Sequence, residues 1–231
     1  EMIPARKEYY DAIPRIAQRH RKYVMSHFGC VYNCSYCSTS LQRKTYKSKA
    51  YKEFWLTRRP VSNVINEVKD LMKYETQEIS LEDDDFLFGF HKQDTWMESF
   101  VSAWKSEINL PAYANVTPTT VVKVPDKTLE TFSKLVSSVQ MGVQVSRRES
   151  LELFNRKFQS DNQVKEAYDR LISFGINVKL ELIVGLPVKD PLEDAISSIK
   201  MAQRIGSGTF VSCFPLMLYP GTELWRWCKE K

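Results

Sequence analysis

The sequence predicts an α/β protein, a partial (β/α)6 TIM-like barrel in which a parallel sheet carries outer helices. Two observations lead to this fold class. Short apolar or β-branched runs alternate with segments of helical periodicity along the whole chain, and no internal repeat interrupts the alternation. Strands that alternate with helices form parallel sheets through right-handed crossovers, so six such units predict an open barrel.

Six runs rich in β-branched and aromatic residues predict the strands. They occupy residues 23–28, 78–81, 112–116, 140–145, 178–184 and 209–218. Between them, apolar residues recur at helical intervals in 61–72, 129–136, 167–172 and 195–202. Proline and aspartate are typical of helix starts, and they precede three of these segments, as Pro60, Pro125-Asp126 and Asp190-Pro191.

The length of 231 residues suits one well-buried domain. We expect an N-terminal lead-in segment at 1–22 and a core domain at 23–231 that belongs to a longer protein. Both ends look like cuts, because the chain starts at Glu1 and stops within a helical-looking segment. No apolar run approaches the ~18 residues of a membrane helix, and no signal peptide is visible. These features predict a cytoplasmic protein without a membrane partner.

Three cysteines within eight residues carry the strongest chemical signal. Cys30, Cys34 and Cys37 have the spacing Cys-x3-Cys-x2-Cys, directly after the first predicted strand. Thiolates select iron–sulfur clusters or zinc, and three of them can hold three corners of a cubane cluster. The fourth iron would then be open to a small molecule. The alternatives are a zinc site with His27 as fourth ligand, or buried thiols without a metal.

The cysteine loop resembles the signature of the radical S-adenosylmethionine (radical SAM) superfamily, Cys-x3-Cys-x-aromatic-Cys, with Tyr36 in the aromatic place. The resemblance implies a 4Fe-4S cluster whose open iron binds the amino and carboxylate groups of SAM. Electron transfer then cleaves the sulfonium and gives a 5′-deoxyadenosyl radical. The resemblance also implies an electron donor such as flavodoxin or ferredoxin, and an organic substrate that the sequence does not identify.

Four consecutive acidic residues follow the second predicted strand, at 82–85. Such acids repel one another, so we expect cationic partners or raised pKa values for some of them. In the superfamily this strand end accepts hydrogen bonds from the methionine ammonium. The candidates are Glu82, Asp83 and Asp84, with Asp83 slightly preferred. The alternative is a helix cap with solvated acids.

The fourth and fifth predicted strands supply the remaining candidates by resemblance. Gln144 would reach the ribose or methionine portion, and Arg156, expected on the following helix, would pair with the carboxylate. A planar guanidinium suits bidentate carboxylate binding. Glu181 would accept the ribose hydroxyls and Ile183 would pack on adenine. Alternatively, Arg156 is a surface residue and Glu181 a satisfied structural acid. One departure is that 145–147 reads Val-Ser-Arg where Ser-Gly is more usual.

Several segments are most similar to the core of cobalamin-dependent radical SAM enzymes. These include the acids at 82–85 and the segment 219–224, Tyr-Pro-Gly-Thr-Glu-Leu. The resemblance implies a methyltransferase, or an enzyme remodelling an unactivated carbon, with cobalamin in a domain outside this chain. A methylthiotransferase acting on RNA or protein remains open, with the basic run 43–52 as its docking surface. A non-catalytic cluster carrier or sensor is the third reading.

Overall fold

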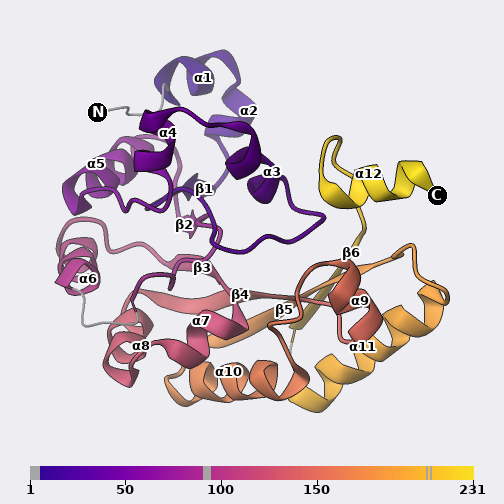
Figure 1. Ribbon diagram of the computed structural model, residues 1–231. Helices are drawn as coiled ribbons and strands as arrows, with labels where there is room; N and C mark the ends of the chain where they lie inside the picture. Colours follow the sequence, from indigo (N-terminus) through magenta and orange to yellow (C-terminus); the bar gives the residue numbers. More distant parts are fainter. Residues whose placement is uncertain (1–5, 91–94, 207, 209) are drawn as a thin grey trace.

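The computed structural model describes residues 6–90, 95–206, 208 and 210–231. Its centre is a six-stranded sheet with the order β1-β2-β3-β4-β5-β6, and every neighbouring pair is parallel (Figure 1). The strands are β1 (Arg21–Val24), β2 (Glu78–Leu81), β3 (Ala112–Val116), β4 (Val136–Gln144), β5 (Asn177–Val184) and β6 (Phe210–Pro215). The predicted α/β partial barrel is therefore confirmed.

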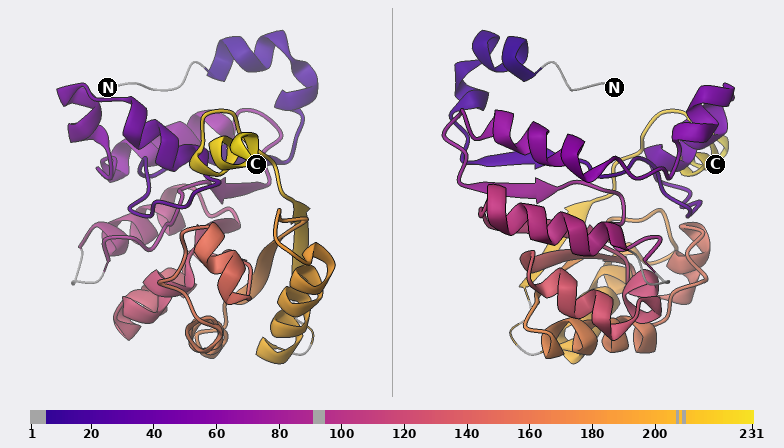
Figure 2. Two further views of the ribbon diagram at one scale, coloured as in Figure 1. Left: turned by 45° about the vertical axis from the view of Figure 1, so that its right-hand side comes forward. Right: turned by 90° about the vertical axis from the view of Figure 1, so that its left-hand side faces the viewer.

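The helices cover the outer face of the curved sheet (Figure 2). Those that connect successive strands include α5 (Val61–Leu71), α6 (Thr95–Glu107), α8 (Asp126–Ser133), α10 (Asp161–Ser173) and α11 (Pro191–Ile205). The shorter helices are α1 (Arg6–Ala12), α2 (Pro14–Ala17), α3 (Ser38–Thr45), α4 (Lys49–Phe54), α7 (Pro118–Lys123), α9 (Arg148–Leu153) and α12 (Glu223–Glu230). No helix in the described ranges is long and apolar enough to cross a membrane.

The predicted helix starts agree with the structure at three places. Pro60 and Pro125 are the N-cap residues of α5 and α8. Asp190 caps α11, where its Oδ1 accepts a hydrogen bond from the Glu193 amide at 3.0 Å. A side-chain acceptor at this position satisfies one of the amides that a helix leaves unpaired at its start.

β2 and β3 have their predicted bounds, and the other four strands differ from them. β5 begins one residue early, at Asn177, and β6 ends at Pro215, three residues before its predicted end. β1 ends at Val24 instead of continuing to Phe28, because the next backbone amides bind a side chain described below. β4 begins at Val136, four residues earlier than predicted. The predicted sixth strand included Thr209, which lies outside the described residues.

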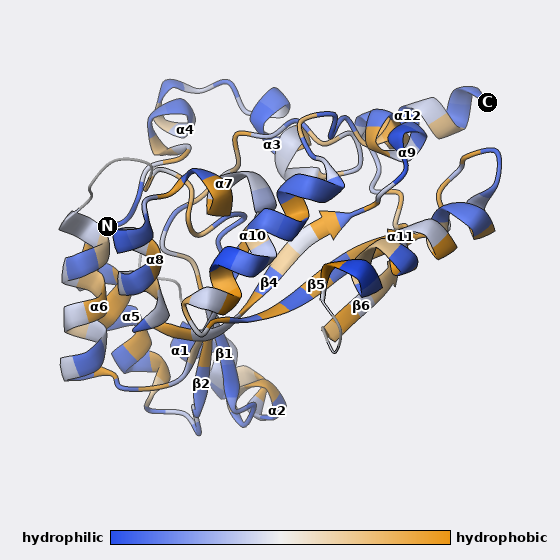
Figure 3. Cartoon of the chain, turned by 90° about the horizontal axis from the view of Figure 1, so that it is seen from below, coloured by the Kyte–Doolittle hydropathy of each residue, from blue (hydrophilic) through white to orange (hydrophobic). Residues whose placement is uncertain are grey.

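One large hydrophobic core lies between the sheet and its outer helices. Phe86 and Phe132 stack within it, with ring centroids 5.4 Å apart and both side chains fully buried. Figure 3 shows the amphipathic character of α10 as colour, with hydrophilic and hydrophobic residues on the same helix, and bands of both colours along β4 and β5. A smaller apolar cluster lies at the carboxyl end of the sheet, built on Phe154, Leu186 and Leu224.

Candidate active site at the carboxyl ends of the strands

A pocket of about 360 Å³ opens where the parallel strands end. Residues on or after β1, β2, β3, β4 and β5 all contribute to its wall, as expected for a site at the carboxyl edge of a parallel barrel. It brings together nine of the ten site residues that the sequence predicts. They are Cys30, Cys34, Tyr36, Cys37, Asp83, Asp84, Gln144, Arg156 and Glu181.

The three cysteines line one wall of this pocket, on the loop between β1 and α3. Backbone contacts hold the loop. The Ser35 amide donates to the Phe154 carbonyl at 3.1 Å, and the Leu224 amide donates to the Ser35 carbonyl at 2.9 Å. From α3, Arg43 Nη1 donates to the Val31 carbonyl at 2.9 Å. The loop is thus fixed to α9, α12 and α3, which are far apart in sequence.

Burial disfavours the ionised form of two of the three thiols in the absence of a metal. Burial raises the pKa of Cys30 to about 12 and also raises the pKa of Cys37. These thiols stay protonated at neutral pH unless a cation displaces the protons, as iron does. Three sulfur donors on one loop at the pocket wall fit a thiolate-ligated iron–sulfur cluster.

The zinc alternative does not fit this geometry. Within the described residues, no three His, Cys, Asp or Glu side chains are grouped so that they could share one metal ion. His27 is 2% exposed, and its Nδ1 lies 3.0 Å from Asp83 Oδ1 instead of facing the cysteines across the pocket. In the described part of the chain, neither ring nitrogen of His27 makes a hydrogen bond.

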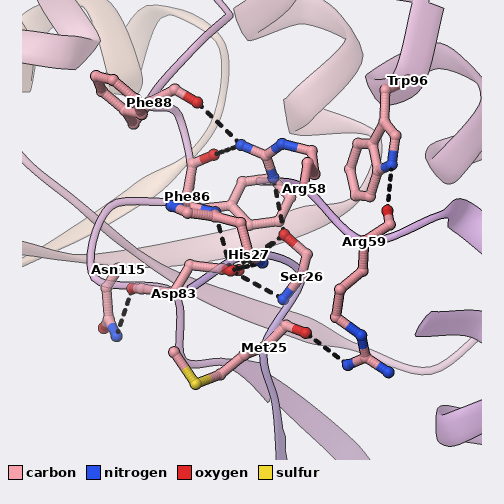
Figure 4. Close-up of polar contacts among 10 residues, drawn as sticks. All are labelled: Met25, Ser26, His27, Arg58, Arg59, Asp83, Phe86, Phe88, Trp96 and Asn115. Carbon is pink, nitrogen blue, oxygen red and sulfur yellow. Dashed lines mark hydrogen bonds and ion pairs between the residues drawn. The ribbon is translucent and has the colours of Figure 1, made fainter. Parts of the chain in front are cut away.

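The Asp83 carboxylate joins the end of β2 to the start of the cysteine loop (Figure 4). It is fully buried, and its Oδ1 accepts hydrogen bonds from the backbone amides of Ser26 at 2.8 Å and His27 at 2.5 Å. The Ser26 hydroxyl adds contacts of 3.1 Å to both carboxylate oxygens. Asp83 is therefore committed to the protein backbone, and the expectation of a helix cap with solvated acids is wrong here.

Arg58 reinforces the same junction from the segment before α5. Its Nη1 donates to Ser26 Oγ at 2.8 Å, and its Nη2 donates to the carbonyls of Phe86 and Phe88, both at 2.9 Å (Figure 4). The guanidinium also lies over the Phe90 ring, 4.2 Å from its centroid. The two loops that follow β1 and β2 are thereby bound to one side chain.

The neighbouring acids Glu82 and Asp84 remain more available to a ligand. Glu82 Oε1 accepts from the Ser80 hydroxyl at 2.6 Å, and Asp84 Oδ1 accepts from the Thr39 hydroxyl at 2.9 Å. Both side chains are half-buried and line the pocket. Burial raises the pKa of Asp84, so a cationic partner would favour its charged form.

Arg156 is buried beneath the cysteine loop. It follows α9, which ends at Leu153, so the expectation of a helical position is wrong, and at 4% exposure it is no surface residue. Its Nη2 donates to the Gly142 carbonyl and to Gln159 Oε1, both at 2.8 Å. Nη1 lies 3.5 Å from Cys34 Sγ, and the buried Nε has no hydrogen-bond partner among the residues that the structure describes.

Gln144 lies at an irregularity near the end of β4. The register with β5 shifts between Gly142 and Gln144, and Gln144 has a φ of +73°. A side chain rarely adopts this left-handed conformation, and such strain is concentrated at functional sites. A Cβ on Gly142 would meet Gln144 Nε2 at 2.9 Å, so this glycine leaves room for the amide beside the pocket.

β5 carries the last two candidates. The half-buried Glu181 carboxylate lines the pocket, and within the described part of the chain it accepts no hydrogen bond. Burial raises its pKa, Lys179 acting in the opposite direction. Ile183 does not line the pocket. It packs with Tyr36 in the smaller apolar cluster, where the Tyr36 and Phe154 ring centroids are 4.4 Å apart.

Sequence reasoning missed two polar residues of the barrel interior, Asn115 and Gln140. They are register partners on β3 and β4, and Gln140 Nε2 donates to Asn115 Oδ1 at 3.0 Å. Lys179 Nζ continues the row by donating to Gln140 Oε1 at 3.4 Å. The available signal was an amide embedded in an otherwise apolar strand, which is costly to bury without a partner.

A second buried carboxylate, Asp85, faces away from the cysteines toward α7. It is 2% exposed and accepts hydrogen bonds from the Thr117 hydroxyl at 2.7 Å and the Thr120 hydroxyl at 2.8 Å. Burial raises its pKa to about 6, although both hydroxyls act against that shift. Thr117 also lies 3.4 Å from the Tyr32 hydroxyl, which lines the pocket.

Comparison with protein-family models gives a match to the Radical SAM superfamily over residues 24–199. No curated protein matches the chain. Among solved structures, the chain is similar to the radical S-adenosylmethionine methyltransferase TsrM from Kitasatospora setae, solved with tryptophan substrate and a SAM analog bound. The TM-score is 0.70 at 16% identity, with 94% of this chain and 39% of that chain covered.

Two further solved structures share the fold. Coproporphyrinogen III oxidase (HemN) from Escherichia coli has a TM-score of 0.65 at 15% identity, covering 95% of this chain and 50% of that chain. The cobalamin-dependent S-adenosylmethionine radical enzyme OxsB has a TM-score of 0.62 at 12% identity, covering 90% of this chain and 35% of that chain. At these identities the likeness shows the fold alone. The chain spans half or less of the length of these proteins.

The raised pKa of Asp85 predicts a measurable pH dependence of stability. At pH values between the ordinary aspartate pKa and about 6, Asp85 keeps its proton in the folded protein and loses it in the unfolded chain. The stability that this proton contributes is therefore lost as the pH rises through 6. The variant Asp85→Asn should therefore lose less stability than the native protein between pH 5 and pH 8, by about 1.4 kcal/mol.

Urea unfolding at both pH values measures this difference. Asp190→Asn is the matched control, because it neutralises an exposed carboxylate and keeps a helix cap. The control should show the same pH dependence of the free energy of unfolding as the native protein. Equal pH dependence in native protein and Asp85→Asn would contradict the prediction.

Proposed function

The chain belongs to the radical SAM superfamily, and we propose that Cys30, Cys34 and Cys37 bind the 4Fe-4S cluster on which this superfamily cleaves SAM. The observation that carries the proposal is the set of three half-buried or buried thiols on one wall of a pocket whose other walls are polar. When bound, the cluster supplies the electron for cleavage. The residues of this chain hold SAM, orient it and limit the access of water.

Among the acids, Asp84 and Glu82 suit the methionine ammonium better than Asp83. The Asp83 oxygens already accept hydrogen bonds from two amides and a hydroxyl. A carboxylate in that position has little capacity left, whereas Asp84 is half-buried in the pocket wall and accepts hydrogen bonds only from the Thr39 hydroxyl and the Gly29 amide among the described residues. We therefore assign Asp83 to positioning the loop and Asp84 to the ligand.

The remaining roles follow from the groups left without partners. Glu181, which accepts no hydrogen bond within the described residues, suits two ribose hydroxyls. Its register partner on β4 is Gly142, and the Gln144 side chain lines the same pocket. The unpartnered Nε of Arg156 suits the methionine carboxylate. Ile183 lies outside the pocket wall, in the smaller apolar cluster that Tyr36 shares with the pocket, so its contact with the adenine ring is proposed from the resemblance alone.

The cluster assignment predicts about four irons and four labile sulfides per chain after anaerobic reconstitution, because three thiolates leave one cubane corner for SAM. Cys30→Ala, Cys34→Ala and Cys37→Ala should each lose most of this iron, while Cys213→Ala, an exposed cysteine, should retain it. Iron and sulfide analysis measures the cluster content of the native chain and of each variant. One zinc per chain and no sulfide would refute the assignment.

The ligand assignment predicts weaker SAM binding in Asp84→Asn and Glu181→Gln. Each loses a charge-assisted hydrogen bond worth on the order of 1.5–3 kcal/mol, so the Kd should rise about tenfold or more. Asp83→Asn is the informative comparison, since it should lower the free energy of unfolding. Calorimetry on reconstituted protein measures binding. Unchanged affinity in Asp84→Asn and Glu181→Gln, with the cluster intact, would remove these assignments.

For the finer activity, we propose methylation or remodelling of an unactivated carbon with cobalamin bound by a domain outside this chain. The support is the acidic segment 82–85, the segment 219–224 and the fold shared with TsrM, a methyltransferase, and OxsB, a cobalamin-dependent enzyme. The competing activity is methylthiotransfer to RNA or protein. A cluster carrier is disfavoured, because it has no use for the unpartnered Glu181 and Arg156 groups in the pocket.

These alternatives predict different full-length proteins. The cobalamin enzyme should purify with about one corrinoid per chain, visible by its absorbance, because cobalamin domains bind the cofactor tightly. A methylthiotransferase should instead carry three further cysteines and a second cluster, close to eight irons per chain. Absorbance and iron analysis of the full-length protein separate the two. A second cluster without corrinoid would overturn the preferred activity.

A further inference from the structure

The segment immediately after the cysteine loop forms a strongly basic surface. Residues 38–52 contain five cations and no acid, although the net charge of the whole chain is only +5. Four of the cations, Lys44, Lys47, Lys49 and Lys52, are exposed on α3, α4 and the turn between them. Lys44 and Lys49 reach Glu223 and Glu53, whereas Lys47 and Lys52 form no ion pair within the described residues.

Aromatic side chains are exposed between these lysines. Tyr46 is 55% exposed and Phe54 is 46% exposed. We name the set Tyr46, Lys47, Lys52 and Phe54 the α3–α4 surface. Exposed aromatic rings bordered by cations are typical of a protein-binding surface, where the rings provide contact area and the charges steer the partner. The charge selects an acidic partner.

A continuous row of rings connects this surface to the cysteine loop. The ring centroids of Tyr46 and Tyr51 are 5.0 Å apart, and those of Tyr51 and Trp55 are 5.4 Å apart. The Trp55 ring lies directly against Gly29, where a Cβ would approach it to 2.6 Å. Gly29 precedes Cys30, so only one residue separates the last ring from the first proposed cluster ligand.

Arg43 links α3 to the cysteine loop. From α3, its Nη1 lies 2.9 Å from the Val31 carbonyl and 3.5 Å from the Cys30 carbonyl. Figure 1 shows α3 and α4 together at the rim, beside the loop that leaves β1. The pocket proposed to hold SAM includes none of the α3–α4 surface, so a bound protein there would leave that pocket open.

We propose that the α3–α4 surface docks an acidic, low-potential one-electron carrier protein. The inference rests on the proposed function, because SAM cleavage consumes an electron. The carrier is oxidised by one electron and the cluster is reduced by one. That electron then breaks the sulfonium carbon–sulfur bond, giving methionine and the deoxyadenosyl radical. A nucleic acid fits less well, since the rings pack on one another instead of standing free to stack on bases.

The test uses an acidic flavodoxin as the probe and two double variants with the same change of net charge. Lys47→Glu/Lys52→Glu alters the α3–α4 surface. Lys105→Glu/Lys200→Glu alters exposed lysines of α6 and α11. Biolayer interferometry measures flavodoxin binding to the chain, with or without a cluster, and stopped-flow absorbance measures cluster reduction by flavodoxin and by dithionite.

We expect the first variant to bind flavodoxin about tenfold more weakly at low ionic strength and to be reduced by it correspondingly more slowly. The control should behave like the native chain, and dithionite should reduce all three equally. Equal flavodoxin binding by both variants would overturn this inference but not the proposed function. The inference would also be overturned if the native chain bound a single-stranded RNA but not flavodoxin, and the first variant lost that RNA binding. The surface would then be a nucleic-acid site. A native chain without a dithionite-reducible cluster would overturn the proposed function and this inference together.

Discussion

One buried carboxylate organises the carboxyl edge of the sheet. β1 ends at Val24, and the next amides can no longer pair with a neighbouring strand. Asp83, at the end of β2, accepts the amides of Ser26 and His27 instead. A buried amide without an acceptor is costly, so this contact determines where the strand stops and the direction in which the cysteine loop leaves it. Arg58 binds the other side of the same junction.

The four consecutive acids illustrate how environment assigns different roles to one residue type. Asp83 and Asp85 point into the protein, the first toward backbone amides and the second toward threonine hydroxyls. Glu82 and Asp84 are half-buried and face the pocket. Alternation along an extended segment explains the separation of Asp83 from its neighbours. Like charges crowded in sequence are thus kept apart in space, which lowers the repulsion expected from the sequence alone.

The alternation of apolar runs was sufficient to predict the sheet, because each β-strand and helix buries its own apolar face. The pocket was also predictable, since parallel strands end at one edge. Two features required the structure. The competition of Asp83 for the amides after Val24 is a contact between distant residues that no local pattern contains. The buried position of Arg156 depends on the end of α9 at Leu153, where periodicity alone would extend the helix.

The order of the sheet has a further consequence for the isolated chain. Within the described residues β6 pairs with β5 alone, so its other side presents unpaired backbone groups, together with Phe210 at 80% exposure and Phe214 at 47%. A strand edge with exposed aromatic side chains is a template for pairing with another chain. Concentrated solutions of this domain are therefore expected to self-associate through β6, and a charged residue in place of Phe210 would protect the edge without touching the pocket.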